Sequence, residues 1–150
     1  MIDIAICNEQ TTHHVAGERL EGAVRAILED AEVRRATVSV AVLNDASIQR
    51  LNREYLQHDY PTDVLSFVLE RSEAELDGEV IVSADTAAAS ADRFGWTLAD
   101  ELLLYVIHGT LHLVGYDDDE PGRRAEMRKR ELHYLGKFGL EPRYDEAAAK

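Results

Sequence analysis

The chain has 150 residues, 45% of them hydrophobic, which is enough to bury one core, so we expect a single domain over residues 1–150. Its 16 Lys and Arg against 29 Asp and Glu give a formal charge of −13, which repels nucleic acid at long range, so contact with RNA requires a local basic patch. The single cysteine, Cys7, excludes an internal disulfide and a cysteine-based zinc site. The sequence shows neither a signal peptide nor a membrane span, so we expect a cytoplasmic protein. Neither a membrane nor DNA is expected as a partner.

Hydrophobic spacing predicts alternating strands and helices in the first part of the chain. A partly alternating run favours a strand at 2–7, and apolar residues at helical spacing favour a helix over 17–31. β-Branched alternation predicts a second strand at 37–43, and two cap-forming residues open a helix over 44–55.

Turn residues separate two further strands in the middle of the chain. Tyr60-Pro61-Thr62-Asp63 is typical of a turn, and a strand at 64–69 follows it. Asp77-Gly78 predicts the next turn and 79–82 the return strand, so these two strands are expected to pair as a hairpin.

The remaining residues favour helices. An alanine-rich helix is predicted over 83–93 and is stopped near Gly95, and Thr97 caps a strongly apolar helix that follows. A last amphipathic helix is expected over 121–138, and 141–150 is predicted to be a disordered tail. The fold class is therefore α+β, with a small mixed β-sheet packed against about five helices.

The apolar helix carries the most informative pattern in the chain. His108 and His112 are four residues apart, which places both imidazoles on one helix face. Gly115 can end the helix and let the chain double back, so that Asp118 reaches the same ion, with Asp119 as the fallback ligand. The plain alternative is two histidines satisfied within a core helix, followed by a solvated acidic turn. The combined spacing favours a metal site on this helix and the turn after it.

Three protein ligands with one open position are typical of a catalytic metal, which activates water and polarises a phosphoryl or carbonyl oxygen. We expect one Zn²⁺ per chain, although two histidines and a carboxylate also suit Fe²⁺ or another divalent ion. Hydrolysis is the default reaction. Metzincin peptidases share similar spacing but need a glutamate directly after the first histidine, where this chain has Gly109, so peptidase chemistry is not expected.

Other polar residues favour structural roles when each is considered alone. The basic run at 123–130, which includes Arg124 and Arg128, is predicted to be a solvated helix face rather than an RNA-binding patch. Asp63 is expected to be a turn residue rather than a general base. The other histidines lack a partner at ligand spacing and are expected to be surface or structural residues: His13, His14, His58 and His133.

Three segments in the right order resemble the YbeY family, bacterial rRNA maturation factors described as zinc-dependent single-strand endoribonucleases. The histidine segment is similar to that family's H-G-x-L-H-L-x-G-Y-D-H signature, and two earlier segments are similar to its other signatures. The segments are His108 to Asp117, Leu51 to Phe67 and Asp77 to Ser83.

The resemblance implies an α+β fold, a metal on three ligands beside a cleft, and work on ribosomal RNA and the ribosomal small subunit in rRNA maturation and ribosome quality control. It also places Thr62 and Ser66 in the cleft, where their hydroxyls are catalytic candidates beside metal-bound water. Without the resemblance, Thr62 is better explained as a turn cap and Ser66 as an ordinary strand residue. No residue is assigned as the catalytic base.

The chain departs from the family pattern at two positions. Asp118 replaces the family's third histidine, and the added negative charge weakens the ion as a Lewis acid. Leu56 replaces an arginine that in the family contacts RNA phosphate, which removes a bidentate donor. Two alternatives therefore remain beside the nuclease: an RNA- or ribosome-binding factor with weakened catalysis, and a metal-dependent hydrolase of another substrate.

Overall fold

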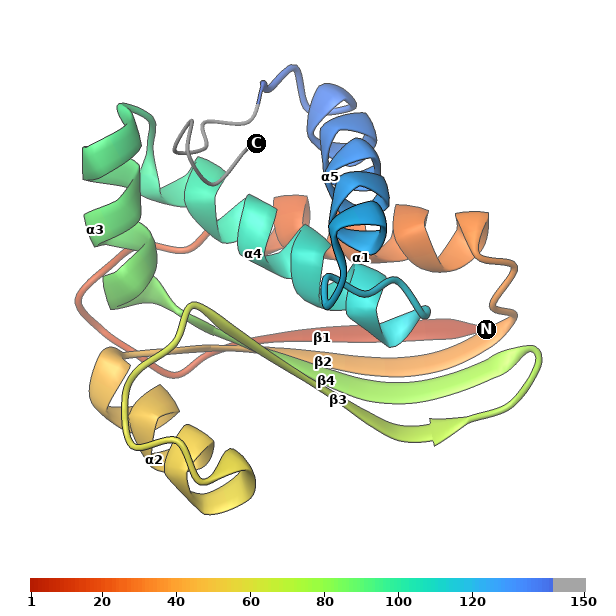
Figure 1. The fold of residues 1–150 in the computed structure, drawn as a ribbon, viewed down its shortest axis with the longest axis horizontal. Helices are drawn as coiled ribbons and strands as arrows, with labels where there is room; N and C mark the ends of the chain where they lie inside the picture. Colours follow the sequence, from red (N-terminus) through yellow and green to blue (C-terminus); the bar gives the residue numbers. More distant parts are fainter. Residues whose placement is uncertain (142–150) are drawn as a thin grey trace.

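The computed structural model describes residues 1–141 as a four-stranded mixed sheet with five helices (Figure 1). The sheet has the order β1-β2-β4-β3, in which β1, β2 and β4 are parallel and β3 pairs antiparallel with β4. The elements are β1 Ile2–Asn8, α1 Gly17–Asp30, β2 Arg35–Leu43, α2 Asp45–Leu56, β3 Val64–Arg71, β4 Glu75–Ser83, α3 Ala84–Phe94, α4 Leu98–Leu113 and α5 Pro121–Gly136. The predicted α+β class and mixed sheet are confirmed.

The helices divide between the two faces of the sheet. Figure 1 shows α4 crossing one face, with α1 and α5 packed around it, while α2 lies on the other side. The main core fills the α4 side, and a small cluster joins α2 to the opposite face through Leu43, Ile48, Leu65 and Ile81. Because α4 is apolar around nearly its whole circumference, it is buried along most of its length. No helix of the described part is long and apolar enough to cross a membrane.

The helix ends follow the cap chemistry that the sequence predicts. The side chain of Asn44 accepts a hydrogen bond from the Ser47 backbone N–H and opens α2, and Thr97 does the same for Asp100 at the start of α4. Gly95 ends α3 with a φ of 76°, a left-handed conformation that costs glycine no steric penalty. These three boundaries are confirmed.

The predicted turn at Asp77-Gly78 is wrong. Both residues lie inside β4, and the hairpin reverses before Glu75, at residues 72–74. A Cβ at position 78 would lie 3.0 Å from a Leu113 methyl and 3.2 Å from the Phe67 carbonyl oxygen. This glycine therefore allows a close approach between α4 and the hairpin, not a turn. The predicted disordered tail, apart from Glu141, lies outside the described residues.

Gly109 brings α4 into its closest contact with the sheet. A Cβ there would lie 2.6 Å from Val80 Cγ1 and 2.9 Å from Val64 Cγ2, and it would also crowd the Ser66 hydroxyl. No side chain fits at this position without moving a strand or the helix. The glutamate that a metzincin requires after its first histidine is therefore excluded by packing as well as by sequence.

We predict that Gly109→Ala destabilises the protein, because the overpacked methyl costs about 1–3 kcal/mol while the gain in helix propensity returns at most about 1 kcal/mol. Gly122→Ala in α5 is the matched control, since a Cβ there meets nothing within 4 Å. Urea unfolding followed by circular dichroism measures both variants. Equal unfolding midpoints for wild type and Gly109→Ala would contradict the packing account.

Candidate metal centre

The imidazole rings of His108 and His112, in the second half of α4, converge through their Nε2 atoms. One helical turn separates them, and their Nε2 atoms lie 3.1 Å apart, with ring centroids 4.7 Å apart. Both side chains are about one quarter exposed, so the rings are mostly packed but not sealed from solvent. The predicted common helix face is confirmed.

Asp118 reaches this point because the chain reverses at Gly115. That residue has a φ of 105°, and the following N–H of Tyr116 bonds back to the Leu111 carbonyl, which closes α4. The Asp118 carboxylate then lies 3.4 Å from His108 Nε2 and 3.6 Å from His112 Nε2.

The three side chains fit a divalent ion. One ligand atom from each of His108, His112 and Asp118 lies within 4.8 Å of the others. Ligands placed 2.0–2.1 Å from a tetrahedral ion are separated by roughly 3.3 Å, so only small side-chain shifts are needed to enclose one. The group could therefore hold a metal ion, and its ligand types alone do not select the metal.

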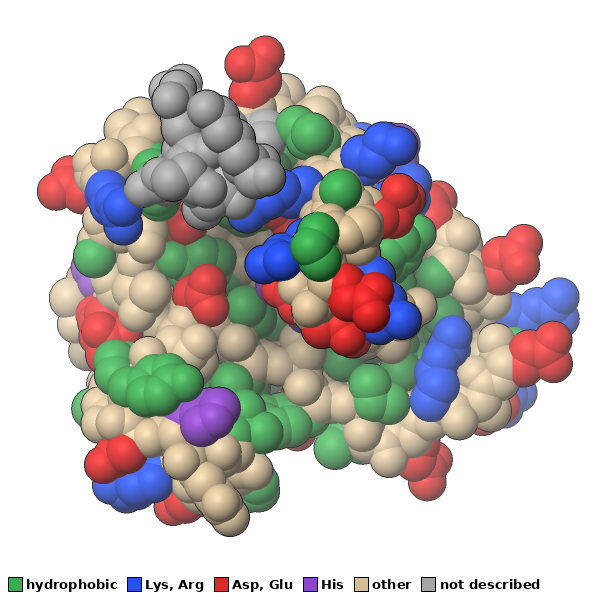
Figure 2. Space-filling view, in the orientation of Figure 1, with side chains coloured by type: hydrophobic (Ala, Val, Ile, Leu, Met, Phe, Trp, Pro, Cys, Tyr) green, Lys and Arg blue, Asp and Glu red, His purple; other side chains and the backbone are tan. Residues whose placement is uncertain are grey.

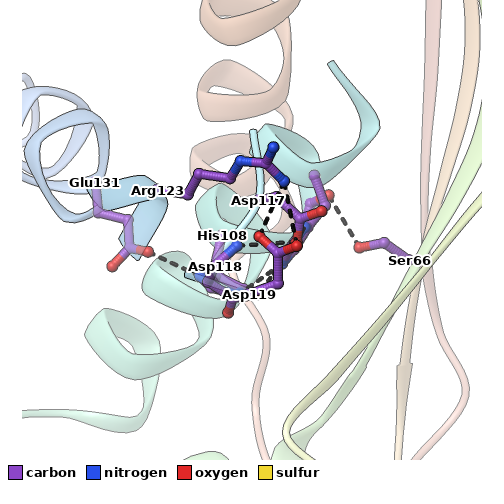
Figure 3. A network of polar contacts seen from close by, with 9 residues as sticks. Ser66, His108, Asp117, Asp118, Asp119, Arg123 and Glu131 are labelled. Carbon is purple, nitrogen blue, oxygen red and sulfur yellow. Dashed lines mark hydrogen bonds and ion pairs between the residues drawn. The ribbon is translucent and has the colours of Figure 1, made fainter. Parts of the chain in front are cut away.

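The neighbouring aspartates are engaged elsewhere (Figure 3). Asp119 pairs with Arg123, with contacts of 3.1 and 3.2 Å, and both side chains are exposed. Asp117 accepts the backbone N–H of Asp118 at 2.9 Å and so shapes the turn. Of the two ligands left open by the sequence, Asp118 is the one that the structure places beside both histidines.

A carboxylate that the sequence analysis missed holds His108 from behind. Glu131 of α5 lies 2.7 Å from His108 Nδ1, and its side chain is only 4% exposed (Figure 3). A carboxylate on the far nitrogen fixes the imidazole tautomer and ring orientation, leaving Nε2 for a metal. The signal was an acid on the apolar face of α5, four residues from both Met127 and Leu135, which are buried.

The surroundings favour the charged form of His108. Burial lowers the pKa of His108, but the hydrogen bond to Glu131 and the negative charges of Glu131, Asp118 and Asp63 together raise it above its ordinary value. Because a metal needs the unprotonated nitrogen, the proton competes with the ion, and metal affinity must fall as the pH is lowered.

Two cavities meet at the His108–Asp118 pair. One of about 490 Å³ is lined by Leu56 and Ser66, and the other, of about 280 Å³, lies between α4 and α5. Asp63 lines both cavities. The site is therefore a cleft with an open side, as a hydrolytic metal centre requires.

The predicted cleft hydroxyls have different environments. Ser66 lines the 490 Å³ cavity, and its hydroxyl donates to the Gly109 carbonyl at 2.9 Å, which ties β3 to α4. Thr62 donates to Asp63 Oδ1 at 3.3 Å, and that oxygen also accepts the Val64 N–H. These bonds fit the turn role expected for Thr62 and Asp63, and the catalytic roles of Thr62 and Ser66 stay predictions.

The basic run of α5 does not form one solvated face. Arg124 and Arg128 line the 280 Å³ cavity. Arg123 pairs with Asp119, and Arg130 donates to the Tyr134 hydroxyl. Two guanidinium groups therefore border the cleft of a strongly acidic protein. The histidines outside the group have local contacts: His13 with Asp85, His58 with Tyr60 and His133 with Tyr134.

Comparison with known proteins extends the similarity over nearly the whole described chain. The family model described as endoribonuclease YbeY matches residues 5–139. A Rhodopirellula baltica protein named endoribonuclease YbeY is 47% identical over 109 residues, which span 71% of this chain and 56% of that protein. A Syntrophotalea carbinolica protein of the same name is 41% identical over 138 residues, 86% of this chain and 92% of that protein. The solution structure of a Thermotoga maritima protein superposes with a TM-score of 0.62 and 28% identity, over 100% and 99% of the two chains.

We predict that Asp118→Ala loses the metal and Asp119→Ala keeps it, because Asp118 lies beside both histidines and Asp119 pairs with Arg123. Native mass spectrometry after zinc loading and buffer exchange gives the metal content of each variant. Full zinc occupancy in Asp118→Ala would remove that residue from the ligand set.

Glu131→Gln is predicted to weaken zinc binding by about 10- to 100-fold, the range measured when such outer partners of histidine ligands are changed. Glu126→Gln, an exposed position on the same helix, is the control and keeps wild-type affinity. A chromophoric chelator competition measures both dissociation constants. Unchanged affinity in Glu131→Gln would reduce the His108–Glu131 contact to a packing interaction.

Proposed function

This chain belongs to the endoribonuclease YbeY family, and on that premise we propose that it is a metal-dependent, single-strand-specific endoribonuclease of rRNA maturation and ribosome quality control. The observation that carries the proposal is the convergence of His108, His112 and Asp118 where two cavities meet. Its proposed partners are ribosomal RNA and the ribosomal small subunit, and its proposed compartment is the cytoplasm.

We propose Zn²⁺ as the ion, one per chain, because two imidazoles and one carboxylate with an open position suit catalytic zinc. A bound ion would stabilise the negative charge that develops on the scissile phosphate. Fe²⁺ suits the same ligand set and is the main competitor. Asp118 adds a negative charge that a histidine would not, so this chain is proposed to be a weaker Lewis-acid enzyme than family members with three histidines.

The other cleft residues position the reaction. Glu131 holds the His108 ring so that Nε2 faces the cleft, and Asp117 fixes the turn that presents Asp118. Asp63 is exposed and lines both cavities, so its carboxylate is the one we propose to accept a proton from the attacking water. Arg124 and Arg128 would attract the phosphate backbone to the α5 side of the cleft.

A second candidate function follows from Leu56. This residue is 45% exposed and lines the 490 Å³ cavity together with the His-His-Asp group, at the position where the family carries an arginine. A leucine there gives no charge-assisted bond to phosphate, so RNA binds the cleft with one donor fewer. An RNA- or ribosome-binding factor with weak cleavage is therefore the competing proposal.

We predict that the zinc-loaded protein cleaves single-stranded RNA but not duplex RNA, that chelation abolishes cleavage and that added zinc restores it. His112→Ala is expected to be inactive. His58→Ala is expected to retain activity, because the His58 ring stacks on Tyr60 and does not line the metal-site cavity. Leu56→Arg is expected to raise kcat/KM by about 10- to 150-fold, because a hydrogen bond to a charged group contributes about 1.5–3 kcal/mol.

Gel assays with end-labelled RNA test these expectations, with binding measured in parallel by fluorescence anisotropy. RNA that binds zinc-loaded wild type but is never cut, even by Leu56→Arg, would favour the binding factor. Cleavage that persists in His112→Ala would reject the metal site as the catalytic centre.

A further inference from the structure

The 280 Å³ cavity shares His108 and Asp118 with the metal site, and the end of it that lies toward the start of α4 has no role in the cleavage chemistry proposed above. One face of α4 supplies Glu101, Leu104, Tyr105 and then His108, a spacing of three, four and seven residues that keeps them in one row. The helices α3 and α5 form the sides of the cavity. Figure 2 shows Lys and Arg side chains gathered on the α5 side. We call this space the α3–α5 cavity.

Glu101 is a buried carboxyl group in the wall of this cavity. It is 4% exposed, accepts the indole N–H of Trp96 at 2.8 Å, and receives a further bond from the Tyr105 hydroxyl, which in turn contacts Ser90. A carboxylate can accept about four hydrogen bonds, so these two donors leave acceptor capacity for a ligand. Burial also raises the pKa of Glu101, because the charged carboxylate is removed from water.

The cavity has the size and character for one flat ring. Its volume of about 280 Å³ lies just below the range of about 300–1,000 Å³ that pockets for drug-sized ligands cover. Phe94, Leu104 and Met127 give it apolar walls, and Glu101 provides a polar end. Proteins take up an unstacked base of single-stranded RNA by stacking it on aromatic or guanidinium planes and by hydrogen-bonding its edge. Phe94 and Glu101 supply an aromatic ring and a hydrogen-bonding group to this cavity, whose remaining lining is largely charged.

The cavity also stands at a suitable place relative to the metal ligands. Seven residues of α4 separate Glu101 from His108, which is about 10 Å along the helix axis. A phosphate at His108 and a base near Glu101 can therefore belong to the same or to adjacent nucleotides. Arg124 and Arg128 line the same cavity from α5, and the exposed Arg124 offers a guanidinium group to the backbone between the two points.

We propose that the α3–α5 cavity binds the nucleobase next to the cleaved phosphate, and that the Glu101 carboxylate accepts a hydrogen bond from the base's exocyclic amino group. This proposal rests on the endoribonuclease function proposed above. Cytosine carries such an amino group at its 4-position and adenine at its 6-position, where uracil and guanine carry a carbonyl oxygen. The subsite therefore disfavours uracil.

Cytidine monophosphate (CMP) and uridine monophosphate (UMP) form the most discriminating test pair. Their rings have the same size, and the 4-position carries an amino group in cytosine and a carbonyl group in uracil. A well-made contact to a base edge discriminates by about 1–3 kcal/mol, so CMP is expected to bind about tenfold more tightly than UMP. Trp96 is the only tryptophan of the chain and donates to Glu101, so its fluorescence reports binding at the cavity without any cleavage.

Glu101→Gln changes the hydrogen-bond polarity with little change of shape. The glutamine oxygen can keep the hydrogen bond from Trp96. The amide N–H₂ then faces the cavity, so that a hydrogen-bond donor replaces the carboxylate acceptor. The preference for CMP is then expected to disappear or to reverse toward UMP. Phe94→Ala, at the half-buried wall, is expected to weaken both nucleotides while keeping their ratio, and the exposed Glu126→Gln to match wild type.

The experiment titrates metal-free full-length protein with CMP and UMP, then with oligoribonucleotides that differ by one C or U, and follows Trp96 fluorescence. A CMP preference that Glu101→Gln removes, in both mononucleotides and oligomers, is the expected result. Equal affinities in wild type would overturn the proposal even if Glu101→Gln fails to fold. A lower melting temperature with an unchanged CMP preference would make Glu101 a structural residue only.

The oligomer series separates the two sources of a nucleobase. A preference seen with mononucleotides but absent from RNA would identify a free-nucleotide site and overturn the RNA subsite. Because neither titration needs zinc or cleavage, failure of the endoribonuclease proposal in the gel assay stays distinct from failure of the base-binding proposal.

Discussion

The close contact between α4 and the sheet at Gly109 determines where the functional groups lie. With no side chain at this position, the helix settles against Val80 and Val64, and the Ser66 hydroxyl bonds directly to its backbone. His108 directly precedes the contact and His112 follows it, and both histidines line the 490 Å³ cavity together with residues of β3. A larger residue would lift the helix and displace both imidazoles together, which couples the packing of the core to the geometry of the metal site.

Buried acids in this protein are each given a specific partner. Glu131 is satisfied by His108, and Glu101 by Trp96 and the Tyr105 hydroxyl. Burying a carboxyl group without such partners would cost several kcal/mol, on the order of the whole stability of a small domain. Both acids lie in the wall of the same cavity, Glu131 behind a proposed metal ligand and Glu101 against the proposed base. The free-energy cost of burying a carboxyl group is therefore borne at the proposed functional cleft.

The sequence was a good guide where the signal is local. The spacing of the two histidines, the helix-ending Gly115 and the caps at Asn44 and Thr97 depend on residues a few positions apart, and the structure places Asp118 where the doubling back of the chain predicts it. Glu131 could not be paired with His108 in this way, because 23 residues and a turn separate them. Only the packing of α5 on α4 brings the two together.

The turn wrongly predicted at Asp77-Gly78 also reflects a contact between residues that are distant in sequence. Aspartate followed by glycine is a strong local turn signal. Here, however, the glycine lies in a strand, and its lack of a side chain allows the close approach of Leu113, which is distant in sequence. The cavity between α3 and α5 also could not be predicted from local sequence patterns, because three helices contribute to it. Taken one at a time, residues such as Phe94, Leu104 and Met127 have the sequence pattern of ordinary core or surface positions.

Zinc K-edge X-ray absorption of the loaded protein tests the metal centre most directly, because it reports the ligand atoms themselves. The account predicts a four-coordinate shell with two imidazole nitrogens at about 2.0–2.1 Å and oxygen ligands at about 2.0–2.2 Å. A shell of oxygen alone, or of one imidazole, would show that His108 and His112 do not bind the ion together, and would contradict the assignment of this site.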